Sequence, residues 1–235
     1  MASLDAKISP ATDPNLAAFF DREAQTWDER YEARTYTERR ELVARVVRRE
    51  LGKCNRPLQE INILDFGCGS GVLVREMRKL GATITGVDSS KPMIDAAQSS
   101  LLQRDDGVHL EWVGNGSASA AYARSQYDII LCISVLEFVS DFRSAVSHLC
   151  ALLRPGGVLI ISVPNRKSIL RWCELKIHSH PRLFARFSVF RQLTSPRCYL
   201  NLQKRQFAHA ELSQALHARG MVEEEHRFCV APTVL

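Results

Sequence analysis

A turn that contains three closely spaced glycines, Gly67, Gly69 and Gly71, constrains the fold of this chain more than any other feature. It follows the apolar stretch 61–66 and precedes residues 72–80, whose apolar side chains recur at helical spacing. A strand that turns through glycines into a helix leaves backbone N–H groups facing open space, with no Cβ to block a ligand. The pattern therefore predicts a strand, a tight turn and a helix that together bind a nucleotide-like molecule.

An acidic residue also follows the next predicted strand, where a nucleotide-binding unit of this kind has a carboxylate. A second buried strand is predicted at 82–88, and it ends in Asp88, 21 residues after Gly67. An acid at the end of the second strand accepts hydrogen bonds from ribose hydroxyls. The glycines form the pattern D-x-G-x-G-x-G from Asp65 to Gly71, whereas a dinucleotide site has G-x-G-x-x-G. The spacing disfavours a dinucleotide-dependent oxidoreductase.

The glycine segment resembles motif I of the class I S-adenosyl-L-methionine (SAM) methyltransferases, and three further segments continue this resemblance across residues 61–164. Residues 88–93 resemble the ribose-and-adenine segment of the family, 127–139 its fourth strand, and 152–162 its fifth strand with the preceding turn. The resemblance implies an α/β fold of the Rossmann-like type, with a doubly wound, mostly parallel sheet. It also implies SAM as the cofactor and methyl transfer to a small-molecule acceptor.

The resemblance further implies which residues hold the cofactor. The glycines let the backbone pass against the methionine moiety and the ribose, Asp65 orients the turn or receives the ammonium group, and Asp88 takes the ribose diol. The complete set is Asp65, Gly67, Cys68, Gly69, Gly71, Asp88, Ser89, Met93, Asn115, Gly116 and Ile133. Met93 would contact adenine, although a core position is an alternative, and Asn115 would bind the adenine amino group or serve only in a turn.

The acceptor side of the site is less defined. Residues 135–139 resemble the "LEHV" segment of ubiquinone-pathway O-methyltransferases, but Phe138 replaces the histidine. The candidates for a catalytic base are Glu137, His178 and His180, and no residue is assigned to a metal. O-methylation of a hydrophobic or lipid-linked metabolite is favoured. N-methylation, for instance of an amino sugar, and a SAM-fold binding protein without catalysis stay open as alternatives.

The 235 residues, 46% of them hydrophobic, suit one methyltransferase domain. Strands that alternate with helices predict a parallel sheet. The expected strands lie near 61–66, 82–88, 108–114, 127–134 and 157–164, followed by a helix at 207–220 and a sixth strand at 221–230. The expected parts are an N-terminal helical cap (1–55), a SAM-binding core (61–164), a lid insert (165–205) and a C-terminal helix and strand (206–235). A seventh strand would have to be short or missing.

The positive charge of the chain is concentrated in one segment. Residues 166–205 contain ten lysines and arginines and one acid, a net charge of +9, whereas the whole chain has +5. Apolar residues at three- and four-residue steps predict amphipathic helices at 168–177 and 182–193. Such helices suit either an anionic membrane surface or a lid over the acceptor. No nucleic-acid partner is expected, and the oligomeric state is left open.

The seven cysteines contain no C-x-x-C pair, which favours reduced thiols over a disulfide framework or a zinc site. The first residues are polar and include Asp5, Lys7 and Asp13, so no signal peptide is expected. We therefore expect a cytoplasmic protein, in peripheral contact with the inner face of a membrane if the basic segment binds lipid.

Overall fold

The computed structural model describes residues 14–32, 34–101, 105–114, 122, 126–195 and 198–227. Five strands form one sheet in the order β3-β2-β1-β4-β5, and every neighbouring pair is parallel. The strands are β1 (Asn62–Phe66), β2 (Thr83–Asp88), β3 (Val108–Trp112), β4 (Tyr127–Ile133) and β5 (Leu153–Ser162). The predicted doubly wound α/β fold is confirmed.

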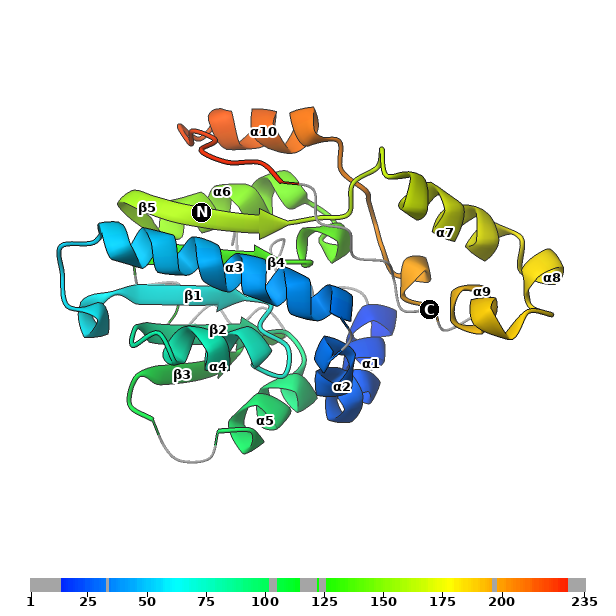
Figure 1. Cartoon of the computed structure of the whole chain (residues 1–235), viewed down its shortest axis with the longest axis horizontal. Helices are drawn as coiled ribbons and strands as arrows, with labels where there is room; N and C mark the ends of the chain where they lie inside the picture. The colour runs from blue at the N-terminus through cyan, green and yellow to red at the C-terminus, as the bar shows by residue number, and fades with distance from the viewer. Residues whose placement is uncertain are drawn as a thin grey trace.

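Helices cover both faces of this sheet (Figure 1). Helices α3 and α4 lie in front of the sheet in this view, and α6 lies behind it. The helices are α1 (Pro14–Glu23), α2 (Trp27–Glu32), α3 (Arg34–Lys53), α4 (Val72–Arg78), α5 (Lys91–Ser99), α6 (Phe142–Leu152), α7 (Ile169–Ser179), α8 (Pro181–Phe184), α9 (Arg191–Thr194) and α10 (His209–His217). Short 3-10 turns lie at Ala24–Thr26, Leu58–Glu60, Leu136–Phe138, Ser188–Phe190 and Tyr199–Asn201.

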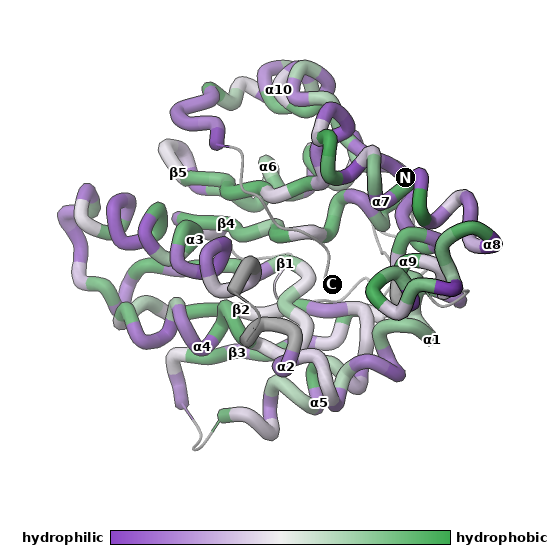
Figure 2. Tube along the Cα trace, turned by 45° about the vertical axis from the view of Figure 1, so that its right-hand side comes forward, coloured by the Kyte–Doolittle hydropathy of each residue, from purple (hydrophilic) through white to green (hydrophobic). Residues whose placement is uncertain are grey.

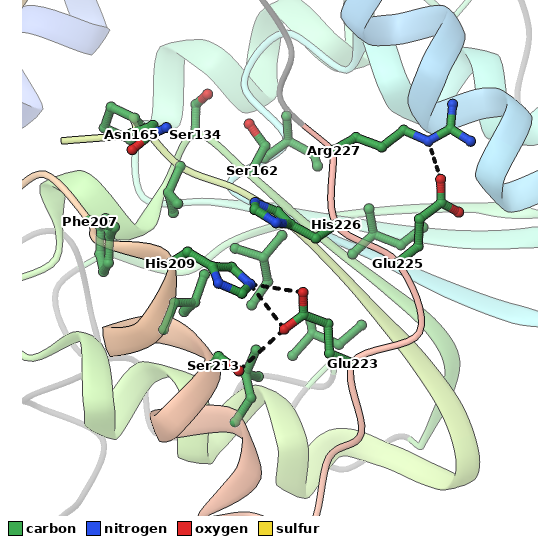
Figure 3. Close-up of a pocket in the computed structure, with 18 of the residues that line it drawn as sticks. Ser134, Ser162, Asn165, Phe207, His209, Ser213, Glu223, Glu225, His226 and Arg227 are labelled. Atoms are coloured by element: carbon green, nitrogen blue, oxygen red, sulfur yellow. Dashed lines mark hydrogen bonds and ion pairs between the residues drawn. The ribbon is translucent and has the colours of Figure 1, made fainter. Parts of the chain in front are cut away.

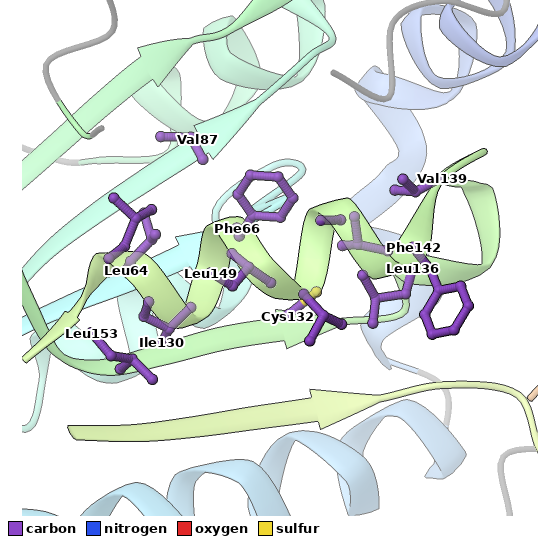
Figure 4. Packing of buried hydrophobic residues seen from close by; sticks show 14 of the residues in the cluster. Leu64, Phe66, Val87, Ile130, Cys132, Leu136, Val139, Phe142, Leu149 and Leu153 are labelled. Carbon is purple, nitrogen blue, oxygen red and sulfur yellow. The ribbon is translucent and has the colours of Figure 1, made fainter. Parts of the chain in front are cut away.

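The central strands are apolar on both faces because each face is covered by helices. In β1, Ile63 belongs to the core between the sheet and helices α3 and α4, whereas Leu64 and Phe66 belong to the core on the α6 side. Figure 4 shows the latter cluster, in which Leu149 of α6 packs over these strands. Two continuous cores thus fix the sheet and the position of its strand ends.

The carboxyl ends of the parallel strands meet at one edge, and two groups of helices lie beyond it. Helices α1 and α2 lie near the ends of β1 and β2, and α7, α8 and α9 project farther out (Figure 1). The predicted N-terminal cap (1–55) includes α3, but from here on the word cap means residues 14–32 only. We call residues 165–205 the insert. Ligands of open parallel sheets bind at this edge, so the cap and the insert both border the expected site.

The insert differs from the prediction in its second half. Helix α7 matches the helix predicted at 168–177, but 182–193 is not one helix and consists of α8, a 3-10 turn and α9. The aromatic side chains there pack on one another instead of forming a stripe. The ring centroids of Phe184 and Phe190 lie 5.6 Å apart and those of Phe187 and Phe190 lie 6.2 Å apart, both edge to face. This local clustering accompanies the interrupted helix.

The sixth strand predicted at 221–230 is wrong for its described part, because residues 221–227 form no strand. The segment contains three consecutive glutamates, a residue type that strands disfavour. Its acids bond to flanking helices: Glu225 to Arg49 of α3 at 2.5 Å, and Glu223 to His209 of α10 at 2.8 Å. The remainder of the predicted strand and the short seventh strand lie outside the described residues.

Candidate cofactor site and acceptor pocket

The glycine turn has the geometry that its sequence predicts. Gly67, Gly69 and Gly71 have φ angles of 80°, 54° and 79°, a region that other residues rarely adopt. A Cβ on Gly67 would lie 2.4 Å from Cγ2 of Val135, and one on Gly69 would lie 3.2 Å from Nε1 of Trp27. Side chains are therefore excluded from this turn, so the backbone itself can contact a ligand.

Asp88 is fixed directly against the turn. Its Oδ2 accepts the N–H of Gly69 at 2.9 Å, and its Oδ1 accepts the N–H of Ser90 at 2.8 Å. Burial raises the pKa of this carboxyl group, while these backbone hydrogen bonds act in the opposite direction. A carboxylate has about four acceptor positions, so Asp88 keeps acceptor capacity for a ribose hydroxyl of SAM.

Asp65, in β1, is a buried acid with an unsatisfied oxygen. Asp65 is only 2% exposed, and its Oδ2 has no hydrogen-bond partner among the described residues. Burial, and then the negative charge of Asp88, raise the pKa of Asp65 to about 7. An unsatisfied buried acid is costly, and the ammonium group of SAM would supply the missing donor and charge. The residues present therefore fit this cofactor.

The other predicted cofactor residues lie around the same turn. Cys68 is buried, and burial raises the pKa of its thiol. Met93 is 1% exposed, yet its Sδ lies 3.9 Å from the Cβ position of Gly69, so it is a core residue that also adjoins the turn. The Ser89 carbonyl accepts Nε1–H of Trp112 at 2.8 Å, and Ile133 ends β4. Asn115 and Gly116 lie outside the described residues.

The cap contributes contacts to this site that no motif predicted. Asp21 accepts a hydrogen bond from Oγ of Ser90 at 2.6 Å. Asp28 accepts one from Nη2 of Arg75 at 2.7 Å and another from the Ser70 hydroxyl. Together with Trp27 against Gly69, these bonds hold the cap over the glycine turn. The partners are more than 40 residues apart, and no local sequence signal links them.

Phe138, which replaces the histidine of the related segment, is part of this cap contact. Its ring packs edge to face on Phe20 with centroids 5.5 Å apart, and Phe20 packs in the same way on Trp27 at 5.5 Å. Phe138, which follows β4, therefore packs against the cap through aromatic contacts.

A pocket of about 760 Å³ runs between α3, β5, α10 and residues 221–227 (Figure 3). It reaches the carboxyl end of β4, next to the glycine turn of the neighbouring strand β1. Its lining includes Ile133 and Ser134, which connect it to the cofactor side. Ser134 has a φ of 57°, and its hydroxyl accepts a hydrogen bond from Nη1 of Arg39 at 2.8 Å. The apolar walls come from α3, β5 and α10, so the pocket suits a hydrophobic acceptor with a polar end.

Glu137 lies at that polar end. It is 4% exposed, it lines the pocket, and its Oε2 has no partner within the described part of the chain. Burial raises its pKa to about 7, while a backbone hydrogen bond and the charges of Arg39 and Arg171 act in the opposite direction. Arg171 itself bonds to the Tyr199 hydroxyl at 2.6 Å and to Glu174 at 3.0 Å.

The two candidate histidines bond within the insert. Nδ1 of His178 lies 2.6 Å from the Leu193 carbonyl oxygen, and Nε2 lies 2.9 Å from Oδ1 of Asn201. Nδ1 of His180 lies 3.0 Å from the Lys176 carbonyl oxygen. Neither is part of the lining of the described pocket, whereas Glu137 is.

The parallel sheet, the glycine turn and the acid after the second strand define a nucleotide-binding α/β protein of the class I SAM methyltransferase type. The sequence profile of a family described as methyltransferase domain matches residues 36–228. The chain belongs to this family. SAM is therefore its cofactor.

Two curated relatives and one solved structure illustrate this similarity. A ubiquinone biosynthesis O-methyltransferase from Methylobacterium nodulans is 32% identical over 165 residues, which cover 67% of this chain and 66% of the relative. One from Brucella ovis is 30% identical over 140 residues, 54% of this chain and 56% of the relative. The alignments thus span less than two thirds of these relatives. Magnesium protoporphyrin IX methyltransferase from Synechocystis PCC 6803, solved with bound SAM, shares the fold with a TM-score of 0.58, 18% identity, and coverage of 94% and 93%.

Proposed function

We propose that the chain transfers the methyl group of SAM to an oxygen of a hydrophobic small molecule that binds in the pocket along β5. The observation that carries this proposal is the buried Glu137, whose Oε2 has no hydrogen-bond partner among the described residues where the pocket meets the cofactor side. A hydroxyl acceptor must lose a proton during methyl transfer, and a carboxylate with a pKa near neutrality suits that role. An unprotonated amine needs no such base, so this feature favours O-methylation over N-methylation.

SAM supplies an electrophilic methyl group, and the chain has to position and deprotonate the acceptor. Gly67, Gly69 and Gly71 would admit the cofactor against the backbone, and Asp88 and Asp65 would bind its ribose and its ammonium group. Glu137 would take the acceptor proton at Oε2, the oxygen that has no partner among the described residues. Positive charge from Arg39 and Arg171 acts on this carboxyl group and would also stabilise the oxyanion that forms beside it.

The acceptor class follows from the pocket and the relatives together. The pocket walls are largely apolar side chains of α3, β5 and α10, while Arg39, Ser134 and Glu137 form a polar end. A phenol or enol on an apolar body matches both parts. Since the curated relatives are named for ubiquinone biosynthesis, a phenolic quinone precursor is the acceptor we propose.

The insert would place the enzyme at an anionic membrane surface where such acceptors partition. Apolar residues recur along α7, α8 and α9, which lie beyond the strand ends (Figure 2). The exposed large apolar residues of the insert are Ile169, Leu170, Trp172, Leu175, Leu183, Phe187 and Val189, with Ile169 the most exposed at 79%. Basic residues of the same segment would contact lipid headgroups. Among the described residues, no helix is both long and apolar enough to cross a membrane.

Transfer assays with matched acceptors test the chemistry. Phenols, catechols and amines of similar size would be incubated with labelled SAM and the full chain, and the rate measured from pH 5.5 to 9. We expect transfer to phenolic oxygen, rising through about pH 7 as Glu137 ionises. Glu137→Gln should lower kcat by about two orders of magnitude or more and remove this ionisation, with SAM affinity unchanged.

Glu50→Gln is the matched control, because Glu50 is also buried but is paired with Arg49 and Lys53 on α3. It should leave the pH profile of transfer unchanged. Transfer to amines alone, or a Glu137→Gln variant with full phenol activity, would contradict the proposal. SAM binding without transfer to any acceptor would favour a binding protein.

A further inference from the structure

A second set of chemically active side chains lines the same pocket, on α10 and on residues 221–227. His209 begins α10, and Glu223 and His226 belong to the segment 221–227, which we call the strap. One donor atom of each residue lies within 4.8 Å of the other two, the closest such group of histidine, cysteine and acidic residues in the described part of the chain. We propose that His209, Glu223 and His226 bind one Zn²⁺ ion, which clips the strap to α10.

The three side chains already converge (Figure 3). Nε2 of His209 lies 2.8 and 3.0 Å from the two carboxylate oxygens of Glu223. The rings of His209 and His226 stack with centroids 4.0 Å apart and planes 15° apart. This stacking brings a ring nitrogen of each histidine close to the Glu223 carboxylate, so one cation can contact all three side chains.

Contacts with helices on both sides hold the strap in position next to His209. Glu224 and Glu225 bond to α3, through Lys53 at 3.5 Å and Arg49 at 2.5 Å. On the other side, Ser213 of α10 donates a hydrogen bond to Oε2 of Glu223 at 3.2 Å. Such an outer bond orients a metal-ligating carboxylate. The strap therefore presents Glu223 and His226 to His209 from a position that is held independently of any metal.

The donor types select the ion. Two imidazoles and one carboxylate suit zinc and its first-row neighbours, whereas Mg²⁺ and Ca²⁺ prefer oxygen ligands only. In a tetrahedral zinc site with bonds of about 2.0–2.1 Å, donor atoms lie about 3.3 Å apart. All three side chains are exposed, so small rotations can bring the donors from their present spacing to this distance, with water in the fourth position.

Zinc titration of the untagged full chain tests the site, with calorimetry and thermal unfolding as readouts. We expect one Zn²⁺ per chain, a rise in Tm that a chelator reverses, and no response to Mg²⁺ or Ca²⁺. His226→Ala, Glu223→Gln and His209→Ala should each weaken zinc binding by about tenfold or more. Because the side chains are exposed, these variants should fold like the wild type.

Two controls separate this site from others. His217→Ala removes another histidine of α10 and should bind zinc like the wild type, as should Cys173→Ser, which removes an exposed thiol. Co²⁺ should give absorption bands of a nitrogen- and oxygen-ligated ion, without thiolate charge-transfer bands. Failure of the wild type to bind stoichiometric zinc, or unchanged binding by His226→Ala, would overturn the proposal. SAM binding and methyl transfer do not enter this test.

Discussion

Replacing Glu137 with glutamine should make the protein more stable at alkaline pH while it slows methyl transfer. Burial raises the pKa of Glu137 from 4.5 to about 7. In the unfolded chain the carboxyl group ionises near 4.5, so between these pH values the folded state holds a proton that the unfolded state has released. A group of this kind stabilises the fold at low pH, and its contribution is lost as pH rises through the folded pKa.

The size of the effect follows from the shift. Each pKa unit corresponds to 1.36 kcal/mol, so the full penalty is about 3 kcal/mol, of which about 2 to 3 kcal/mol develops between pH 5 and 8. Glutamine has nearly the same shape and no charge to bury. The free energy of unfolding of Glu137→Gln, relative to that of the wild type, should therefore increase by this amount across that range. Contributions from Asp65 are the same in both proteins and cancel.

Urea unfolding, monitored by tryptophan fluorescence at several pH values, measures this difference. Glu50→Gln should change the pH dependence of the free energy of unfolding in the opposite direction. Burial alone would raise the pKa of Glu50, but hydrogen bonds from Lys53 and Arg49 lower it overall. Glu50 therefore stabilises the fold above its unfolded pKa and loses this effect as pH falls. A difference between wild type and Glu137→Gln that stays constant from pH 5 to 8 would refute the argument.

Three further predictions address the cofactor and the membrane. Asp88→Ala should weaken SAM binding by about 1.5–3 kcal/mol in calorimetry, the scale for hydrogen bonds to a charged group; unchanged affinity would remove Asp88 from the site. Gly69→Val should abolish SAM binding but keep a native circular dichroism spectrum, because a side chain there meets Trp27 and requires an unfavourable φ; surviving transfer activity would contradict this. The protein should co-sediment with anionic vesicles at low salt and be released as salt rises, and Arg182→Glu with Arg186→Glu should reduce this binding without changing SAM affinity; equal binding to neutral vesicles would disprove the electrostatic part.

The glycine turn and the sheet could be predicted from the sequence because their signals are local. A run of buried residues, a glycine that requires positive φ and an acid at a strand end each constrain their own neighbourhood. These signals place Gly67 and Asp88 at one edge of the sheet, where the structure also has them. The expected strand at 221–230 failed for the opposite reason: the fate of residues 221–227 depends on Arg49 and His209, which belong to distant helices.

Contacts between distant segments account for what the sequence did not predict at the site. Arg39 reaches Ser134 across 95 residues, and Asp28 reaches Arg75 across 47. Neither pair has a spacing that a motif could encode, since each depends on how the N-terminal helices pack over the strand ends. The same holds for His209 with Glu223 and His226, which are separated by a helix and a turn.

Asp65 and Glu137 are buried acids, and each has one carboxylate oxygen without a hydrogen-bond partner among the described residues. Asp65 lies in β1, and Glu137 follows β4, the neighbouring strand in the sheet. Both carboxyl groups act electrostatically on the Cys132 thiol of β4, whose pKa is raised first by burial and then by their charges. A penalty of about 3 kcal/mol is a large share of the 5–15 kcal/mol that stabilises a typical domain, and the paired Glu50 shows that this chain can neutralise a buried acid. We therefore propose that ligands pair with these two oxygens, a cationic cofactor with Asp65 on the β1 side and a hydroxyl acceptor with Glu137 on the β4 side.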